Sequence, residues 1–270
     1  MKWNKEKIIF AVHNLEKELK RRPVKKDGSN LYFLSRKYFG SWSNMMNNAG
    51  YDTKILQKPK IPSLNSNLLY YFLGLVCTDG HIVFNKQRGN YKIMISNSQN
   101  EEKEMIIEAI WDLFKYKASV RSRMLGFNKK PNYEIYVSSK VLCNFFIKQL
   151  DVPFGAKSLN IKIPAIMFKV DKRFVWNFIR GVIDGDGSII KTKKSTMLKI
   201  FSGSKDFILG MDKLLRKQGF NSGKISNERK NLWLLRITRK EDIRNMCFLI
   251  YNSCGRYCYQ KKRNIWEQYI

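Results

Sequence analysis

Two stretches of the chain, FLGLVCTDG at residues 72–80 and IRGVIDGDG at residues 179–187, share one pattern. In each, a glycine is followed by two apolar residues, two variable residues and a terminal Asp-Gly pair. A single Asp-Gly after an apolar run most often marks only a turn. Two copies, whose aspartates Asp79 and Asp186 lie 107 residues apart, instead indicate an internal duplication of a domain-sized unit.

The segments that follow the two motifs also match in type. Each motif leads into two strands, a helix and two further strands, and each copy ends in one or two helices. In the first copy the first strand begins at His81, the second covers 91–96, the helix covers 101–114, and the last two strands cover 118–125 and 133–137. In the second copy the first strand begins at Ser188, the second covers 197–202, the helix covers 205–218, and the last two strands cover 223–227 and 232–237. Ser98 and Glu101 form the pattern of a capping box at the start of the first copy's helix. The sequence therefore predicts an α+β fold in which two αββαββα repeats pack as a pseudo-twofold dimer within one chain.

The motifs themselves are expected to be buried helices. Residues 68–77 are almost wholly apolar and residues 174–183 are similar, a composition typical of a helix that protein surrounds on most sides. Gly74 and Gly181 each precede the terminal aspartate by five residues. Small residues let two helix backbones approach closely, so these glycines predict that the two helices pack on each other along the pseudo-twofold axis.

Each aspartate then lies at the C-terminal end of a helix, where the helix dipole is negative. Two carboxylates and two negative helix ends beside one axis repel one another unless a cation neutralises them. Hard oxygen ligands favour Mg²⁺, which keeps waters and is often shared with a substrate phosphate. A small acidic metal site in a strongly basic protein is typical of an enzyme that cleaves phosphodiesters.

The chain carries 51 Lys and Arg against 22 Asp and Glu, a formal charge of +29 over 270 residues. An AT-rich genome accounts for part of this excess, but the uneven distribution of basic residues favours a polyanion partner such as nucleic acid. Because alternate residues of a strand share a face, we expect a DNA-facing sheet in each repeat, with a solvated charged sheet as the alternative. The expected DNA contacts, mostly to phosphate, are Lys86, Arg88, Lys92, Arg121, Arg123, Lys191, Lys193, Lys199, Lys224, Arg229 and Arg236.

Several other classes of protein are disfavoured. The longest apolar stretch, residues 68–77, is about half of the roughly 20 residues that a membrane span needs, and the charged start of the chain is unlike a secretory signal. Five scattered cysteines indicate a reducing compartment, so we expect a protein of the bacterial or phage-infected cytoplasm, or of an organellar matrix, and not a secreted one. Two histidines, His13 and His81, are too few for an HNH nuclease or a zinc cluster.

The two motifs resemble those of the monomeric LAGLIDADG homing endonucleases, over roughly residues 64–270. The resemblance implies two saddle-shaped antiparallel sheets in the DNA major groove, and site-specific cleavage of both strands of double-stranded DNA in the mobility of an intron or intein. It implies Mg²⁺ as cofactor, with Mn²⁺ able to substitute and Ca²⁺ able to bind without turnover. The metal-binding residues that it implies are Asp79 and Asp186, with the adjoining Gly80 and Gly187. The first acidic position of the motif, at which the family varies, is Cys77 in one copy and Asp184 in the other.

Two lysines are implied as further catalytic residues. The stretch GAKSLNIKIP, residues 155–164, resembles the segment in which the family often places a lysine near the cleavage centre, which points to Lys157. Its second-repeat counterpart is YCYQKKRNIWEQ, residues 257–268, in which Lys261 aligns best and Lys262 is the alternative. A lysine there stabilises phosphate charge or polarises the attacking water; a plain surface role is the alternative. The polar residue that the family uses on the second strand of each repeat is left unassigned.

The chain before the repeats forms a separate basic module, residues 1–57, followed by a proline-containing linker at residues 58–63. Helical spacing predicts a first helix capped by Asn4, a second over 31–38 and a third capped by Ser43. The stretches WNKEKII, FGSW and NNAGY resemble the homing-endonuclease-associated helical repeat, which implies accessory DNA binding; a folding or docking appendage is the alternative. The expected phosphate contacts of this module are Lys25, Lys26, Arg36 and Lys37.

The predicted organisation is therefore the module, the linker, a first repeat over 64–165 and a second repeat over 166–270. Because the halves differ at nearly every strand position, we expect a monomer without an obligate protein partner, acting on a long non-palindromic site. A non-cleaving nucleic-acid binder on the same scaffold, either an intron RNA maturase or a transcription regulator, is the competing hypothesis. Retention of both motif aspartates favours the nuclease, since a pure binder has no use for them.

Overall fold

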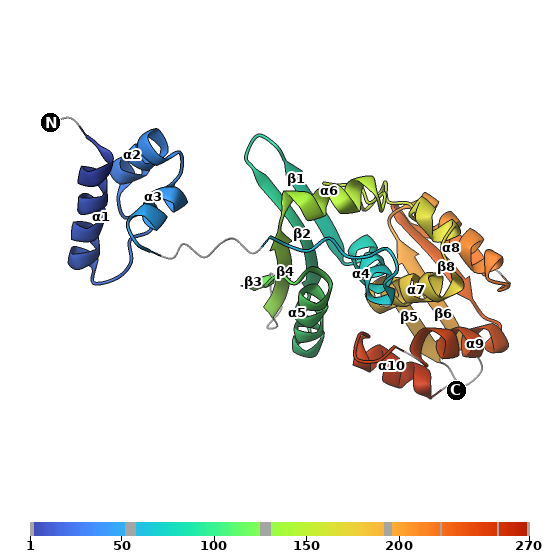
Figure 1. The fold of residues 1–270 in the computed structure, drawn as a ribbon. Helices are drawn as coiled ribbons and strands as arrows, with labels where there is room; N and C mark the ends of the chain where they lie inside the picture. The colour runs from blue at the N-terminus through green and yellow to red at the C-terminus, as the bar shows by residue number, and fades with distance from the viewer. Residues whose placement is uncertain are drawn as a thin grey trace. The chain divides into compact units, whose positions relative to one another are not determined.

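The structure, a computed structural model, describes residues 3–51, 58–124, 131–191, 196–221, 223–252 and 254–268. The chain divides into two compact units, residues 1–58 and 59–270 (Figure 1). Each unit has a hydrophobic core of its own. Within the described ranges, no helix is long and apolar enough to cross a membrane.

Within residues 3–51, the first unit consists of the helices α1 (Lys5–Leu19), α2 (Ser29–Phe39) and α3 (Trp42–Asn48). As predicted, Asn4 caps α1, and its side chain accepts a hydrogen bond from the Lys7 amide at 2.9 Å. The cap of α3 is Ser41, whose Oγ accepts from the Asn44 amide at 3.1 Å. The prediction that Ser43 caps this helix is therefore wrong.

The second unit contains the expected duplication. Its first half consists of α4 (Asn67–Cys77), β1 (Gly80–Asn85), β2 (Asn90–Asn97), α5 (Asn100–Phe114), β3 (Ser119–Met124), β4 (Pro131–Ser138) and α6 (Lys140–Lys148). Its second half consists of the 3-10 helix η1 (Ala165–Phe168), α7 (Lys172–Asp186), β5 (Gly187–Lys191), β6 (Thr196–Ser202), α8 (Lys205–Lys217), β7 (Lys224–Arg229), β8 (Leu232–Ile237), α9 (Lys240–Tyr251) and α10 (Gln260–Glu267). Apart from η1 and α10, both halves follow the order αββαββα, which confirms the predicted α+β fold.

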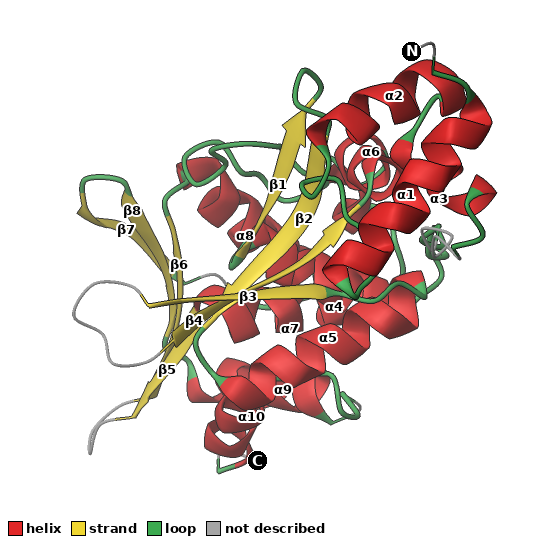
Figure 2. Cartoon of the chain, turned by 90° about the vertical axis from the view of Figure 1, so that its left-hand side faces the viewer, coloured by secondary structure: helices red, strands yellow, loops and turns green. Residues whose placement is uncertain are grey.

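Each half builds one four-stranded antiparallel sheet, in the orders β1-β2-β4-β3 and β5-β6-β8-β7. Alternation along the strands decides which face is buried. In the first sheet, Ile95 pairs with Ile135 and Ile93 pairs with Val137, and all four side chains belong to the core. The helices of the second unit pack on this face of each sheet, and within the described part of that unit none of them covers the opposite face, called the open face here (Figure 2).

The two motif helices, α4 and α7, are in backbone contact at Gly74 and Gly181. A Cβ added to Gly74 would lie 2.8 Å from the Gly181 Cα, and one added to Gly181 would lie 2.9 Å from the Gly74 Cα. The contact continues to the C-terminal ends of the helices, where a Cβ added to Gly185 would lie 2.6 Å from the Thr78 Cβ. The two helix ends therefore lie side by side, which brings the segments that carry Asp79 and Asp186 together.

The start of α5 differs from the prediction. Gln99, and not Ser98, is the N-cap residue, and no side chain caps the helix, so the predicted capping box of Ser98 and Glu101 does not form. The Gln99 amide instead donates to the Oδ1 atom of Asn97 at 2.7 Å. This leaves the Gln99 side chain available for a contact with the second half of the chain, described below.

Replacing Gly74 with Ala is expected to destabilise the second unit by about 3 kcal/mol, because the new methyl group meets backbone atoms of α7 that cannot rotate away. The comparison variant is Gly210→Ala in α8, where the added Cβ would lie 2.8 Å from the Cγ1 atom of Ile163. That side chain must shift, but alanine favours the helix, so we expect a smaller loss of stability than at Gly74. Urea unfolding followed by circular dichroism measures both variants. Equal stability of the two variants would contradict a close backbone contact between α4 and α7.

Candidate functional site

Asp79 and Asp186 are partly buried at the paired ends of α4 and α7. Burial, together with the nearby Asp186 carboxylate, raises the pKa of Asp79 to about 7, although Lys262 and Lys157 act in the opposite direction. Burial likewise raises the pKa of Asp186, and the same two lysines oppose that shift. The two carboxylates therefore hold protons more tightly than usual in the absence of a further cation.

Lys157 is buried, with 8% of its surface exposed. It lies between α6 and η1, and its ammonium group donates to the carbonyl oxygens of Thr78, at 2.9 Å, and of Cys77. These carbonyls belong to the end of α4, where the negative end of the helix dipole stabilises a cation. Burial lowers the pKa of Lys157, and the charges of Asp186 and Asp79 limit that shift.

Lys262 occupies the equivalent place in the second half. From the first turn of α10, its ammonium group donates to carbonyl oxygens at the end of α7, those of Ile183 at 2.9 Å, Gly185 and Gly187 at 3.0 Å, and Asp184. Lys261 is exposed and donates instead to the Oε1 atom of Gln99 at 2.6 Å. The geometry therefore favours the alternative, Lys262, over the predicted Lys261, because consecutive residues of a helix point about 100° apart.

A cavity of about 300 Å³ opens beside these groups. Its lining includes Asp186, Lys157, His81 of β1 and Ser202, the last residue of β6. Burial lowers the pKa of His81, and the charge of Lys157 adds to that shift. Ser202 is a polar residue on the second strand of its repeat, which the sequence analysis left unassigned. The sequence feature that could have identified Ser202 is its place as a polar residue at the end of a strand with alternating apolar residues, directly before the turn into α8.

Two carboxylates are what this site offers a metal ion. In the part of the chain that the structure describes, no three His, Cys, Asp or Glu side chains cluster as a metal site. Mg²⁺ commonly takes one or two carboxylates and completes its shell with water and substrate phosphate, so Asp79 and Asp186 fit such an ion. Of the adjoining glycines, Gly80 lines the cavity, whereas the carbonyl of Gly187 accepts a hydrogen bond from Lys262.

The basic residues predicted on the second sheet include a row that crosses its open face. Lys199 of β6 pairs directly with Arg236 of β8, which in turn pairs with Lys224 of β7. Like charges on directly opposite residues of a sheet repel each other. Glu228, whose carboxylate lies 3.4 Å from the Arg236 guanidinium, offsets part of this repulsion.

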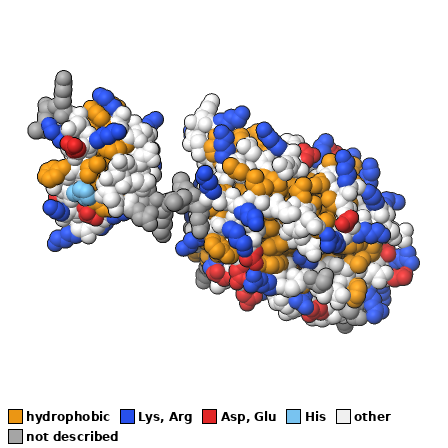
Figure 3. All heavy atoms as spheres, in the orientation of Figure 1, with side chains coloured by type: hydrophobic (Ala, Val, Ile, Leu, Met, Phe, Trp, Pro, Cys, Tyr) orange, Lys and Arg blue, Asp and Glu red, His pale blue; other side chains and the backbone are white. Residues whose placement is uncertain are grey.

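On the first sheet, the predicted residues lie at the β1–β2 turn and along the open face. Lys92 of β2 lies over the ring of Tyr136, 4.6 Å from its centroid, and Arg123 of β3 forms an ion pair of 3.2 Å with Glu134. The exposed members of the predicted set here are Lys86, Arg88, Arg121 and Arg123. Acidic side chains gather elsewhere, over α5, as Figure 3 shows.

The other predicted contacts are distributed as follows. Arg229 is exposed at the end of β7. Lys193 and the side chain of Lys191 lie outside the described residues. The four basic residues predicted to contact phosphate in the first unit, Lys25, Lys26, Arg36 and Lys37, are all exposed.

Comparison with known proteins shows which fold the second unit has. Residues 173–251 match the LAGLIDADG-like domain family. The structure of the homing endonuclease I-DmoI in complex with DNA and Mn aligns with a TM-score of 0.51 and 20% identity, over 68% of this chain and 97% of that chain. The second unit has the two-motif LAGLIDADG fold. Full-length WhiA from Thermatoga maritima has this LAGLIDADG fold too, with a TM-score of 0.50 and 16% identity over 77% of this chain and 61% of that chain.

Curated relatives fall into two groups. The homing endonuclease I-ApeI of Aeropyrum pernix is 23% identical over 205 residues, which cover 73% of this chain and 85% of that protein. Two proteins of Methanocaldococcus jannaschii match over a small part of their length: a probable translation initiation factor IF-2, 27% identical, and the DNA-directed RNA polymerase subunit Rpo1C, 30% identical. The matches take in 76% and 63% of this chain but span only 17% and 18% of those two proteins. The resemblance of the first unit to the homing-endonuclease-associated repeat stays a prediction.

Mg²⁺ is expected to stabilise the LAGLIDADG unit more at about pH 8 than at about pH 5. The pKa of Asp79 in the folded chain, about 7, lies above its ordinary value of 3.8. Stability without metal therefore falls as the pH rises between these two values, because the folded state binds the proton more tightly. At the higher pH the ion meets an ionised carboxylate pair, whereas at the lower pH it must displace a proton.

Thermal unfolding in EDTA and in Mg²⁺ at both pH values measures this effect. The control is Asp79→Asn, which should lose most of the metal effect and be more stable than the unmodified chain at the higher pH without metal. Mg²⁺ shifts of equal size at both pH values would contradict the assignment of Asp79 as a ligand.

Proposed function

We propose that this protein is a site-specific endonuclease that hydrolyses both strands of double-stranded DNA at a long, non-palindromic site. The proposal rests on one observation. Two aspartates and two lysines lie together at the paired ends of α4 and α7, namely Asp79, Asp186, Lys157 and Lys262. Stability does not account for these groups, since burial disfavours the charged form of all four. In this proposal the two ammonium groups suit a phosphate, and the two carboxylates suit the cation that accompanies it.

In this proposal, Asp79 and Asp186 hold a divalent cation, Mg²⁺ with Mn²⁺ as a substitute and Ca²⁺ as a non-productive ligand. Such an ion, when bound, supplies Lewis-acid stabilisation of phosphoryl charge and lowers the pKa of a water. Lys157 has three N–H donors, of which backbone carbonyls take two. The third remains for a phosphate oxygen in the cavity that Asp186 and Ser202 line. Because the ammonium group is already held in place, it needs no reorganisation as charge develops.

The open faces of the two sheets are proposed as the surface that contacts DNA. The row of Lys199, Arg236 and Lys224 is unfavourable in the free protein, and a phosphate backbone laid across it relieves the repulsion. The first sheet carries its charges at other positions, at the β1–β2 turn and on β3. Two unlike surfaces in one chain read two unlike half-sites, so a monomer suits an asymmetric target.

The relatives support this proposal. I-ApeI, which is similar over most of both chains, is a homing endonuclease by name, and I-DmoI structures contain DNA with Mn or Ca. The matches to small parts of a translation factor and of a polymerase subunit are what an element inserted into unrelated genes would leave. They support mobility as part of an intron or intein.

A non-cleaving nucleic-acid binder is the second candidate, because WhiA-type regulators share the fold. The aspartate pair separates the two candidates. A protein that only binds DNA gains nothing from placing two carboxylates beside a surface that must approach phosphates, since they repel the ligand. Retention of Asp79 and Asp186 between Lys157 and Lys262 therefore favours cleavage.

Asp79→Asn and Asp186→Asn are each expected to abolish double-strand cleavage and to leave DNA affinity nearly unchanged, because each removes a ligand and little volume. The wild-type protein is first incubated with Mg²⁺ and a duplex library, and the cut ends are sequenced to define the site. Cleavage and binding of that site, the latter by gel shift in Ca²⁺, are then compared among the variants. Asp171→Asn, the same change at an exposed residue beside α7, is the control. Cleavage at the wild-type rate by either motif variant would exclude the proposed mechanism.

Removing residues 1–58 is expected to weaken DNA binding without removing cleavage, because the first unit has its own core and exposed basic residues. In a plot of log affinity against log salt concentration, the negative slope should also become shallower by about 0.9 for each phosphate contact that is lost. A full-length chain in which Lys25, Lys26, Arg36 and Lys37 are replaced by Gln should reproduce both effects. Unchanged affinity and slope in both proteins would show that the first unit does not contact DNA.

A further inference from the structure

Both central lysines lie on segments that cross to the opposite repeat. Lys157 belongs to residues 155–162, which follow α6 and are called the first strap here. Lys262 belongs to residues 256–262, which follow α9 and are called the second strap. Each ammonium group reaches back to the motif helix of its own repeat, Lys157 to the end of α4 and Lys262 to the end of α7. The first strap contacts the other repeat through its backbone, and the second strap contacts it through side chains.

The first strap rests on the start of α8. Ser204, the N-cap residue of α8, is 1% exposed, and its Oγ donates to the carbonyl oxygen of Ile161 at 2.6 Å. Gly203 lies so close to the strap that an added Cβ would be 2.7 Å from the carbonyl oxygen of Ser158. These contacts are with the backbone of the strap, so they fix its path and not only its side chains.

The second strap rests on the start of α5. Lys261 donates to the side chain of Gln99, the N-cap residue of α5, at 2.6 Å. The side-chain amide of Asn97, just before that cap, donates to the hydroxyl of Tyr259 at 3.1 Å. The backbone amide of Tyr259 in turn donates to the buried carboxylate of Asp184 at 2.9 Å.

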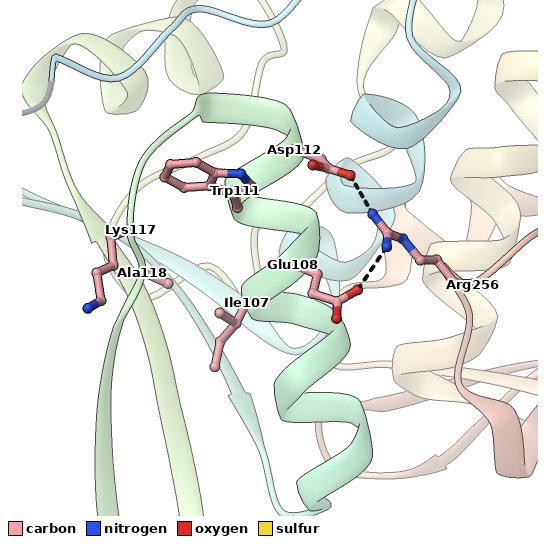
Figure 4. Close-up of a pocket in the computed structure, with 7 residues that line it drawn as sticks. All are labelled: Ile107, Glu108, Trp111, Asp112, Lys117, Ala118 and Arg256. Atoms are coloured by element: carbon pink, nitrogen blue, oxygen red, sulfur yellow. Dashed lines mark hydrogen bonds and ion pairs between the residues drawn. The ribbon is translucent and has the colours of Figure 1, made fainter.

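A second group of contacts ties the beginning of the second strap to the outer face of α5. The guanidinium of Arg256 lies 2.8 Å from the Asp112 carboxylate and 3.5 Å from that of Glu108 (Figure 4). The hydroxyl of Tyr257 also donates to Asp112. The second strap is thus held at both ends by the first repeat.

Gln99 and Ser204 are equivalent positions, since each is the N-cap of the helix that follows the second strand of its repeat. We propose that these two helix starts are positioning sites: the start of α8 positions Lys157, and the start of α5 positions Lys262. Each repeat thereby sets the lysine of the other, and each lysine serves the cleavage of one DNA strand. Lys157 does so through its remaining N–H group, and Lys262 by holding the end of α7, where four carbonyl oxygens already face its three N–H groups. The strand assignment rests on the proposed nuclease function, whereas the crossed docking does not.

The crossed docking is tested by hydrogen–deuterium exchange of the free protein. The double variant Gln99→Ala with Asp112→Asn should speed exchange of the amides in 256–262 by roughly three- to tenfold and leave those in 155–162 unchanged. Ser204→Ala should do the reverse, and Ser204→Thr, which keeps a hydroxyl, should restore protection. The two variants are matched controls for each other. Exchange that rises equally in both straps, or in neither, would overturn the crossed docking.

The strand assignment is tested with the cleaved duplex, labelled separately on each strand. Lys262→Met and the double variant of Gln99 and Asp112 should slow the nicking of the same strand. Lys157→Met and Ser204→Ala should slow the nicking of the other strand, by a similar factor. A general loss of stability would slow both strands equally, which would overturn the positioning role. If the wild-type protein cleaves no duplex, the proposed function and the strand assignment fall together, and the exchange data alone decide the crossed docking.

Discussion

The backbone contact between α4 and α7 at Gly74 and Gly181 is the constraint from which the centre of the second unit follows. Because no side chain separates the helices, their C-terminal ends lie side by side, and two negative dipole ends and two carboxylates are concentrated in one place. Lys157 and Lys262 relieve this repulsion only in part, since both donate hydrogen bonds to the carbonyls at the helix ends. Burial and the Asp186 carboxylate raise the pKa of Asp79 to about 7 in spite of the two lysines.

The two repeats depart from symmetry at the first acidic position of the motif, which is Cys77 in one and Asp184 in the other. Asp184 is fully buried, and burial raises its pKa to about 6. Such a carboxylate is tolerated only with hydrogen bonds, and it accepts them from the hydroxyls of Tyr71 at 2.9 Å and Tyr251 at 2.6 Å and from the Tyr259 amide. Since Tyr71 belongs to α4, this one carboxylate joins both motif helices to the strap that carries the second lysine.

The features that occur in both repeats could be predicted from the sequence. The duplicated motif, the alternation of the strands and the glycines of α4 and α7 are local patterns, and from them the order of elements and the two sheets could be predicted. Helix caps were less certain, because several serines compete at each start. The cap of α3 is Ser41 and not Ser43. At the start of α5 the capping box does not form, and the Gln99 amide instead donates to the Asn97 side chain. The N-cap residue is the one at which the incoming chain turns into the helix, and the neighbouring residues alone do not determine that point.

The choice between Lys261 and Lys262 shows where sequence reasoning reaches its limit. The two residues are adjacent and chemically identical, so no composition or spacing distinguishes them. Their directions are set by the rotation of α10 about its own axis, and that rotation depends on contacts with residues far away in the sequence, Gln99 on one side and Asp184 on the other. Ser202 was missed for the same reason, since it lines a cavity together with Lys157, which comes from the other repeat. Lys262 and Ser202 thus owe their surroundings to contacts that span the two repeats, which a pattern within one repeat does not show.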